Sequence, residues 1–141
     1  MPNQKLPLKN YVPPINIKLS ALWASLMFLY IYADYFMLFM KGHILKMNDG
    51  IMGPLGPATP QIMLGVSVLM IIPSLMIAAC IILPPKINRI VNILFGVIYT
   101  LVIFAAAYGD DTPFWILFSV IEMAITLAIC YFAFKWPRET Q

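Results

Sequence analysis

The sequence predicts an all-α integral membrane protein, an up-down-up-down bundle of four helices with both termini in the cytoplasm. Three observations support this prediction. Of 141 residues, 62% are hydrophobic and only 11% are charged, whereas a soluble domain carries about 25% charged residues. The hydrophobic residues form four runs of about the 20 residues that cross a bilayer as a helix. Prolines lie at the boundaries of these runs, so residues 1–141 are interpreted as a single membrane domain.

The first run covers about residues 17–41 and predicts the first spanning helix. Asn16 is a suitable N-cap residue, and Gly42 ends the run. Asp34 is the only charged residue away from its ends. The run is too long for the hydrophobic core of a signal peptide and has no cleavage site of small residues, so we expect it to be retained.

Residues 42–59, which follow, mix apolar side chains with Lys46, Asn48 and Asp49. Such a mixture is typical of a short segment that lies in the membrane interface. We therefore expect an interfacial loop on the outer side. The glycines and prolines of residues 53–57 then return the chain to the bilayer.

The second run covers about residues 60–83 and opens with Thr59 and Pro60. Threonine caps the first turn of a helix, and proline fits the first helical position because no N–H is needed there. Pro73 lies inside the run, where it removes a backbone hydrogen bond to the carbonyl of Leu69. The sequence therefore predicts a kink near Pro73.

The last two runs cover about residues 88–108 and 113–136. A pair of prolines precedes the first of them, and Gly109 ends it. A threonine and a proline open the second, as they do at Thr59. Because most of the connections are short, consecutive helices are expected to be antiparallel.

The distribution of Lys and Arg predicts the orientation, because cytoplasmic tails and short loops are enriched in these residues. Seven of the nine lie in the two tails and in the loop between the second and third helices: Lys5, Lys9, Lys18, Lys86, Arg89, Lys135 and Arg138. The other side has only Lys41 and Lys46. We therefore expect both termini in the cytoplasm.

Asp34 and Glu122 are the two ionisable residues well inside the predicted helices. Such a group is costly in a membrane, faces the bundle interior or a water-filled cavity, and often marks a functional site. With a rise of about 1.5 Å per residue, the two lie roughly 10 and 13 Å below the outer helix ends. The same arithmetic places Ser67 and Tyr99 at similar depths. We therefore expect one polar layer, with both carboxyl groups facing the interior.

Helical spacing places further polar side chains on the faces that carry the two carboxyl groups. Tyr30 lies one turn before Asp34, and Ser119 and Thr126 flank Glu122. If the two carboxyl groups meet in a medium of low dielectric, they cannot both be ionised, and one would hold a proton. The pattern predicts a site for a proton or a small lipophilic or cationic ligand, formed by Asp34, Glu122, Tyr30, Tyr99 and Ser67.

A structural role for the same groups is an open alternative, because polar side chains also hold helices together. The chain would then be a non-catalytic accessory or scaffolding subunit of a larger membrane complex, with small residues such as Ala78 and Ala105 to Ala107 on an outer face. An enzyme is less well supported, since there is no histidine cluster, no nucleophile with a base and no phosphate-binding glycine loop. We assign no catalytic residue, metal or cofactor.

The expected partners follow from the same composition. Membrane lipid surrounds the helices, and a homo-oligomer or a larger membrane complex is compatible with so small a bundle. Nucleic acid is excluded, because Lys and Arg flank the hydrophobic runs instead of clustering on a solvated face. Trp23 and Trp136 fit the aromatic belt of the interface, and Cys80 and Cys130 are expected to pack as small apolar residues.

Four short stretches carry a resemblance to known sequences: Lys18–Trp23, Tyr30–Tyr35, Met52–Pro57 and Leu83–Arg89. With them, nearly the whole chain resembles a family of small, uncharacterised bacterial membrane proteins with four predicted spans. The resemblance implies the four-span layout, a bacterial origin and hence the bacterial plasma membrane. It implies no site residue, because no activity is established for that family.

Cysteine labelling tests the predicted orientation. In a chain whose two native cysteines are replaced by alanine, a single cysteine at residue 3 should react with a membrane-impermeant thiol reagent only from the cytoplasmic side. A single cysteine at residue 48 should react only from the outer side. Equal labelling of both positions from the cytoplasmic side would contradict the orientation.

Overall fold

The structure is a computed structural model that describes residues 11–137. Within these residues the chain forms helices α1 (Ile15–Met37), α2 (His43–Asn48), α3 (Pro60–Ile82), α4 (Pro85–Ala107) and α5 (Pro113–Phe134), and the short 3₁₀ turn η1 (Gly53–Leu55). Four of the helices, all except α2, are long and apolar enough to cross a membrane. Residues 11–137 contain no β-strand, only an isolated bridge between Ile51 and Pro57. The predicted all-helical fold with four long apolar helices is confirmed.

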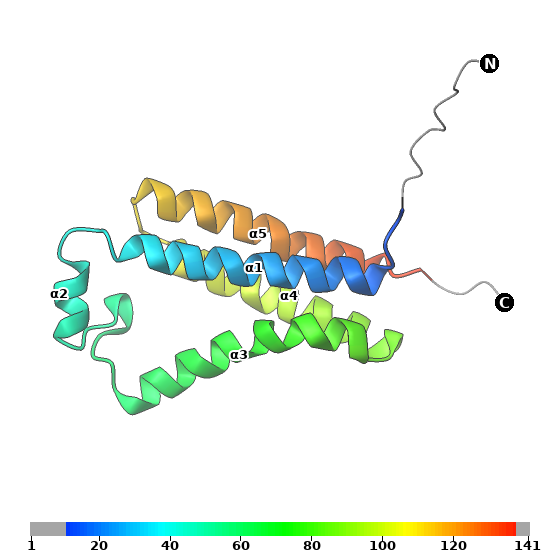
Figure 1. The fold of residues 1–141 in the computed structure, drawn as a ribbon, viewed down its shortest axis with the longest axis horizontal. Helices are drawn as coiled ribbons and strands as arrows, with labels where there is room; N and C mark the ends of the chain where they lie inside the picture. The colour runs from blue at the N-terminus through cyan, green and yellow to red at the C-terminus, as the bar shows by residue number, and fades with distance from the viewer. Residues whose placement is uncertain (1–10, 138–141) are drawn as a thin grey trace, which may run out of the picture.

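The four long helices alternate in direction and form the predicted up-down-up-down bundle (Figure 1). Helix α1 packs against α3 and α5, and α4 packs along α5. We call the end at which α1 begins and α5 ends the tail end, and the opposite end, where α2 lies, the α2 end (Figure 1). The side of a membrane that each end faces stays a prediction.

Local signals explain most helix boundaries. The Thr59 hydroxyl oxygen accepts a hydrogen bond from the Ile62 N–H at 3.3 Å and caps α3. Helix α4 begins at Pro85 instead of Asn88, because proline fits the first helical position here as it does in α3 and α5. Helix α1 ends at Met37, earlier than expected, because its last turn tightens into hydrogen bonds between residues three apart.

The core contains large and small side chains from all four long helices: Leu19, Trp23, Leu26, Met76, Cys80, Tyr99, Ile103, Ile129 and Ala133. Trp23 has no exposed surface, so the expected place in an interface belt was wrong for this residue. Helices α4 and α5 approach closely at Gly96, where an added Cβ would lie 2.5 Å from the Cys130 sulfur. The hydroxyls of Thr100 and Thr126 join the same two helices at 2.7 Å.

Helix α3 bends part-way along its length (Figure 1), and Pro73 lies inside it, in agreement with the predicted kink. Pro73 has no N–H to offer the Leu69 carbonyl. The Tyr99 hydroxyl of α4 donates a hydrogen bond to this carbonyl instead. Residues 60–72 of α3 contain no buried side chain, whereas Pro73, Met76 and Cys80 are buried. Leu69 and Ile72 are partly buried and pack against the core, so helix α3 joins the bundle from about Leu69 onward.

A double-mutant cycle tests whether the Tyr99 hydroxyl replaces the backbone N–H that is missing at Pro73. Tyr99→Phe leaves the Leu69 carbonyl unpaired, so it should lower the free energy of unfolding by about 1–3 kcal/mol. In a Pro73→Ala background the new backbone N–H can bond to this carbonyl, so the same change should cost clearly less. Chemical unfolding of the purified protein measures all four free energies. Strictly additive effects would show that Tyr99 does not serve the proline site.

Candidate functional site

Glu122 lies inside the bundle on the buried face of α5. Only 5% of the residue is exposed, and its neighbours one turn away on either side, Ser119 and Thr126, are buried too. Its Oε1 atom is buried and has no hydrogen-bond partner among the described residues. The predicted interior position is therefore confirmed for this carboxyl group, which stands without the bond that a buried acceptor normally has.

Tyr30 of α1 has a hydroxyl group that could donate a hydrogen bond to this unpaired acceptor. Its hydroxyl is also buried and has no hydrogen-bond partner among residues 11–137. Tyr30 lies close enough to Glu122 and to Tyr99 for their charges to interact, but no bond joins its hydroxyl to Glu122. A buried donor and a buried acceptor thus stand near one another, both unsatisfied, where α1 packs against α5.

Asp34 lies one turn further along α1, and its side chain is exposed. The predicted interior position is therefore wrong for Asp34. Near the α2 end α1 has lost the cover of α3, and within residues 31–40 only Ala33 is buried. Asp34 still lies close enough to Glu122, and to His43 of α2, for the charges to interact. We call Tyr30, Asp34 and Glu122 the carboxyl cluster.

The other two predicted site residues have different surroundings. Tyr99 is buried beside Tyr30, but its hydroxyl is already bonded to the Leu69 carbonyl. Ser67 lies on an exposed part of α3 and donates a hydrogen bond to the Met63 carbonyl of its own helix at 2.8 Å. The structure therefore brings Tyr30, Asp34 and Glu122 together, with Tyr99 alongside, and leaves Ser67 outside.

A second polar cluster lies toward the tail end, and here the polar groups are paired. The Trp23 indole donates to the Asn92 side-chain oxygen at 2.7 Å. The Asn92 amide donates to the Asn88 side-chain oxygen at 2.6 Å, and the Asn88 amide to the Cys80 carbonyl at 2.5 Å. We call Trp23, Cys80, Asn88 and Asn92 the asparagine network. Sequence reasoning missed Asn88, although its position four residues before Asn92 places both on the same helix face.

The chemistry open to the described residues follows from their types. No group of three or more His, Cys, Asp or Glu residues in the described part of the chain could hold a metal ion. The carboxyl cluster offers two acids and a phenol, which suit the binding of a proton or a cation.

A family model matches residues 15–141, which is nearly the whole chain. The chain belongs to the DUF6326 family, a family of unknown function. Membership confirms the resemblance to an uncharacterised family and assigns no role to any residue. Comparison with curated proteins gives no match, and comparison with solved structures gives none.

Stability measurements can separate the two polar clusters of this DUF6326 protein. Glu122→Met removes an acceptor that has no partner, so the free energy of unfolding should stay unchanged or rise. Asn92→Leu strips partners from Trp23 and Asn88, so it should cost about 1–3 kcal/mol for each group left unpaired. Both values come from chemical unfolding in the same detergent. A loss for Glu122→Met as large as that for Asn92→Leu would mean that Glu122 serves packing.

Proposed function

We propose that this chain is a multi-pass membrane protein that takes up a proton or a small cation at the carboxyl cluster. The site lies in the half of the bundle nearer the α2 end, and Glu122 is its central group. The single observation that carries the proposal is the pair of buried, unpaired polar atoms, Glu122 Oε1 and the Tyr30 hydroxyl.

The membrane location is supported by the long helices and by the charge pattern. Each long helix contains a strongly apolar stretch of 18 residues, and only 17–28% of the residues in these stretches are buried inside the bundle. Large hydrophobic side chains therefore cover its outside, a surface suited to lipid. The surplus of Lys and Arg at the tail end favours the cytoplasm for this end, and we place the chain in a bacterial plasma membrane.

The chemistry follows from the cost of an isolated charge inside a membrane. A lone carboxylate surrounded by apolar side chains is strongly disfavoured. A proton on Glu122 removes the charge, and a small cation such as an alkylammonium ion compensates it. In either state the Tyr30 hydroxyl can donate a hydrogen bond to a carboxyl oxygen. The unpaired atoms thus have partners when the site is occupied.

The exposed position of Asp34 gives the site a connection to the α2 end. Asp34 is close enough to the buried Glu122, and to His43 of the short helix α2, for the charges to interact. The Asp34 carboxyl group can accept and release a proton. We therefore propose that protons or cations reach Glu122 from the α2 end by way of Asp34.

Infrared difference spectroscopy tests the site. A protonated Glu122 should give a carbonyl stretching band of a carboxylic acid that disappears as the pH is raised. Glu122→Gln should abolish this band, and Tyr30→Phe should shift its frequency because the nearby hydroxyl is lost. Loss of the band on adding methylammonium would indicate a cation as the ligand, and an unchanged band would indicate a proton.

Asp111→Asn is the matched control, because Asp111 is an exposed carboxyl group in the loop at the α2 end. This change should leave the Glu122 band as it is. The proposal fails if no band in the spectrum depends on Glu122, since the carboxyl group would then neither gain nor lose a proton.

An accessory or scaffolding subunit is the second candidate. Ala78, Ala105 and Ala106 are exposed, and small residues on an outer helix face allow another helix to approach closely. Residues 60–68 of α3, which contain no buried side chain, add to this surface. This candidate gains support if Glu122→Gln and Tyr30→Phe leave both the infrared spectrum and the biological phenotype unchanged.

A further inference from the structure

A groove at the tail end lies between the start of α4 and the end of α5. It has a volume of about 770 Å³, and its walls include Lys86 and Arg89 of α4 and Trp136, which follows α5. Prolines from both sides complete the wall. The groove thus combines two cations with one amphipathic indole ring.

The cations in this groove have no acidic partner within residues 11–137. The acidic residues of this range are Asp34, Asp49, Asp110, Asp111 and Glu122. All of them lie in the loops of the α2 end or in the helix halves next to it. The charge of the groove is therefore not balanced by the described part of the chain, and a bound anion would balance it.

Arg89 adds a more specific sign of a missing partner. Its guanidinium carbon lies 5.7 Å from the centre of the Phe134 ring, which orients the planar group. Its Nε atom is buried and has no hydrogen-bond partner among the described residues. Arginine binds phosphate through two N–H groups at once, so an oriented guanidinium with an unused N–H suits a phosphate group.

The surroundings favour a phosphate that carries acyl chains. Ile87, which lines the groove, and Ile90, one turn along α4, are 49% and 65% exposed. These side chains offer an apolar surface directly beside the cations. Trp136 is of the residue type enriched at headgroup level. Anionic lipids are concentrated in the cytoplasmic leaflet, and the tail end is predicted to face this side.

We propose that this groove binds the phosphate headgroup of an anionic glycerophospholipid. Lys86 and Arg89 bind the phosphate, Trp136 contacts the headgroup region, and the acyl chains run along Ile87 and Ile90. The inference rests on the membrane location proposed above and is independent of the carboxyl cluster.

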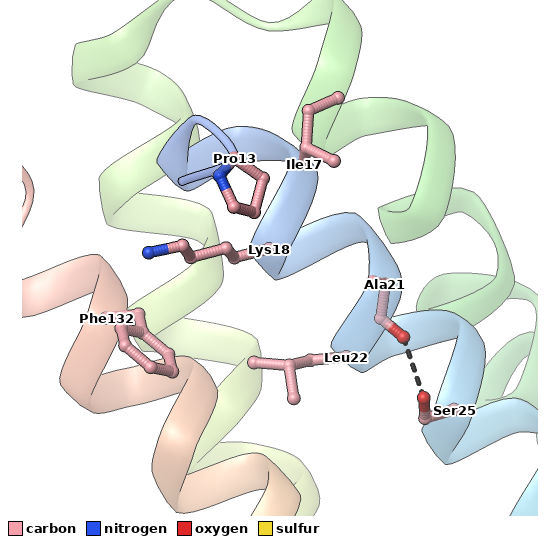
Figure 2. A pocket seen from close by; sticks show the side chains of 7 residues that line it. All are labelled: Pro13, Ile17, Lys18, Ala21, Leu22, Ser25 and Phe132. Carbon is pink, nitrogen blue, oxygen red and sulfur yellow. Dashed lines mark hydrogen bonds between the residues drawn. The ribbon is translucent and has the colours of Figure 1, made fainter. Parts of the chain in front are cut away.

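A smaller groove at the same end, shown in Figure 2, supplies a matched control. It has a volume of about 340 Å³ and lies between α1 and Phe132 of α5. Lys18 is the only charged residue among those that line it, and its ammonium lies 5.8 Å from the centre of the Phe132 ring. The Ser25 hydroxyl in this groove already donates to the Ala21 carbonyl at 2.9 Å. Lys18→Gln therefore removes a charge from the tail end without touching the larger groove.

The experiment measures lipid retention by native mass spectrometry. The full chain is reconstituted in nanodiscs that contain equal amounts of phosphatidylglycerol and phosphatidylcholine, and the lipids that stay bound on release are counted. Phosphatidylglycerol should be retained in preference. Lys86→Gln and Arg89→Gln should each weaken this binding by about fivefold, and the double variant should lose the preference. Lys18→Gln and Glu122→Gln should keep it.

Three results would overturn the lipid site. The first is retention without preference for the anionic lipid. The second is an equal loss in Lys18→Gln, which would reveal diffuse surface charge instead of a groove. The third is displacement of phosphatidylglycerol by glycerol 3-phosphate at equal concentration, which would reveal a site for a soluble phosphate. Failure of the chain to enter nanodiscs at all would instead contradict the proposed membrane location.

Discussion

The Leu69 carbonyl is the group on which much of the bundle depends. Pro73 deprives it of the backbone N–H that it would have in an unbroken helix, and inside an apolar bundle no water replaces the bond. The Tyr99 hydroxyl supplies the missing donor from α4. The Tyr99 ring in turn packs edge-on against Trp23, with ring centroids 5.8 Å apart, and the Trp23 indole bonds to Asn92. The bend in α3 is thereby tied to α1 and α4.

The same bend explains why the two carboxyl groups have unlike surroundings. Beyond Pro73, toward the α2 end, α3 no longer has buried side chains. The adjoining part of α1 is then open, and Asp34 is exposed. Glu122 lies on α5, which packs against both α1 and α4. Its side chain is therefore buried whether or not α3 covers this part of the bundle. One buried and one exposed acid that lie close enough for their charges to interact suit the proposed path from the surface to the interior, whereas two equally buried acids would not.

The sequence predicted the features that depend on a single helix. The proline boundaries, the Thr59 cap, the Pro73 kink and the interior face of Glu122 follow from local chemistry and from a period of 3.6 residues. The sequence did not predict the features that depend on a neighbour. Asp34 shares a helix face with Tyr30, but its cover depends on where α3 leaves the bundle. Trp23 was expected in the interface because tryptophan is enriched there, and nothing in α1 alone indicates that the distant Asn92 accepts a hydrogen bond from its indole.

The contrast between the two polar clusters argues for the position of the function. In the asparagine network, side chains of α1 and α4 and a backbone carbonyl of α3 are bonded at 2.5–2.7 Å, so this bundle satisfies buried polar groups where they serve packing. In the carboxyl cluster the Tyr30 hydroxyl and Glu122 Oε1 lie near each other without a bond. An apolar pair of similar size would remove both unsatisfied groups at little cost. The unbonded pair, in a bundle whose asparagine network is bonded, therefore favours the proposed ligand site between α1 and α5.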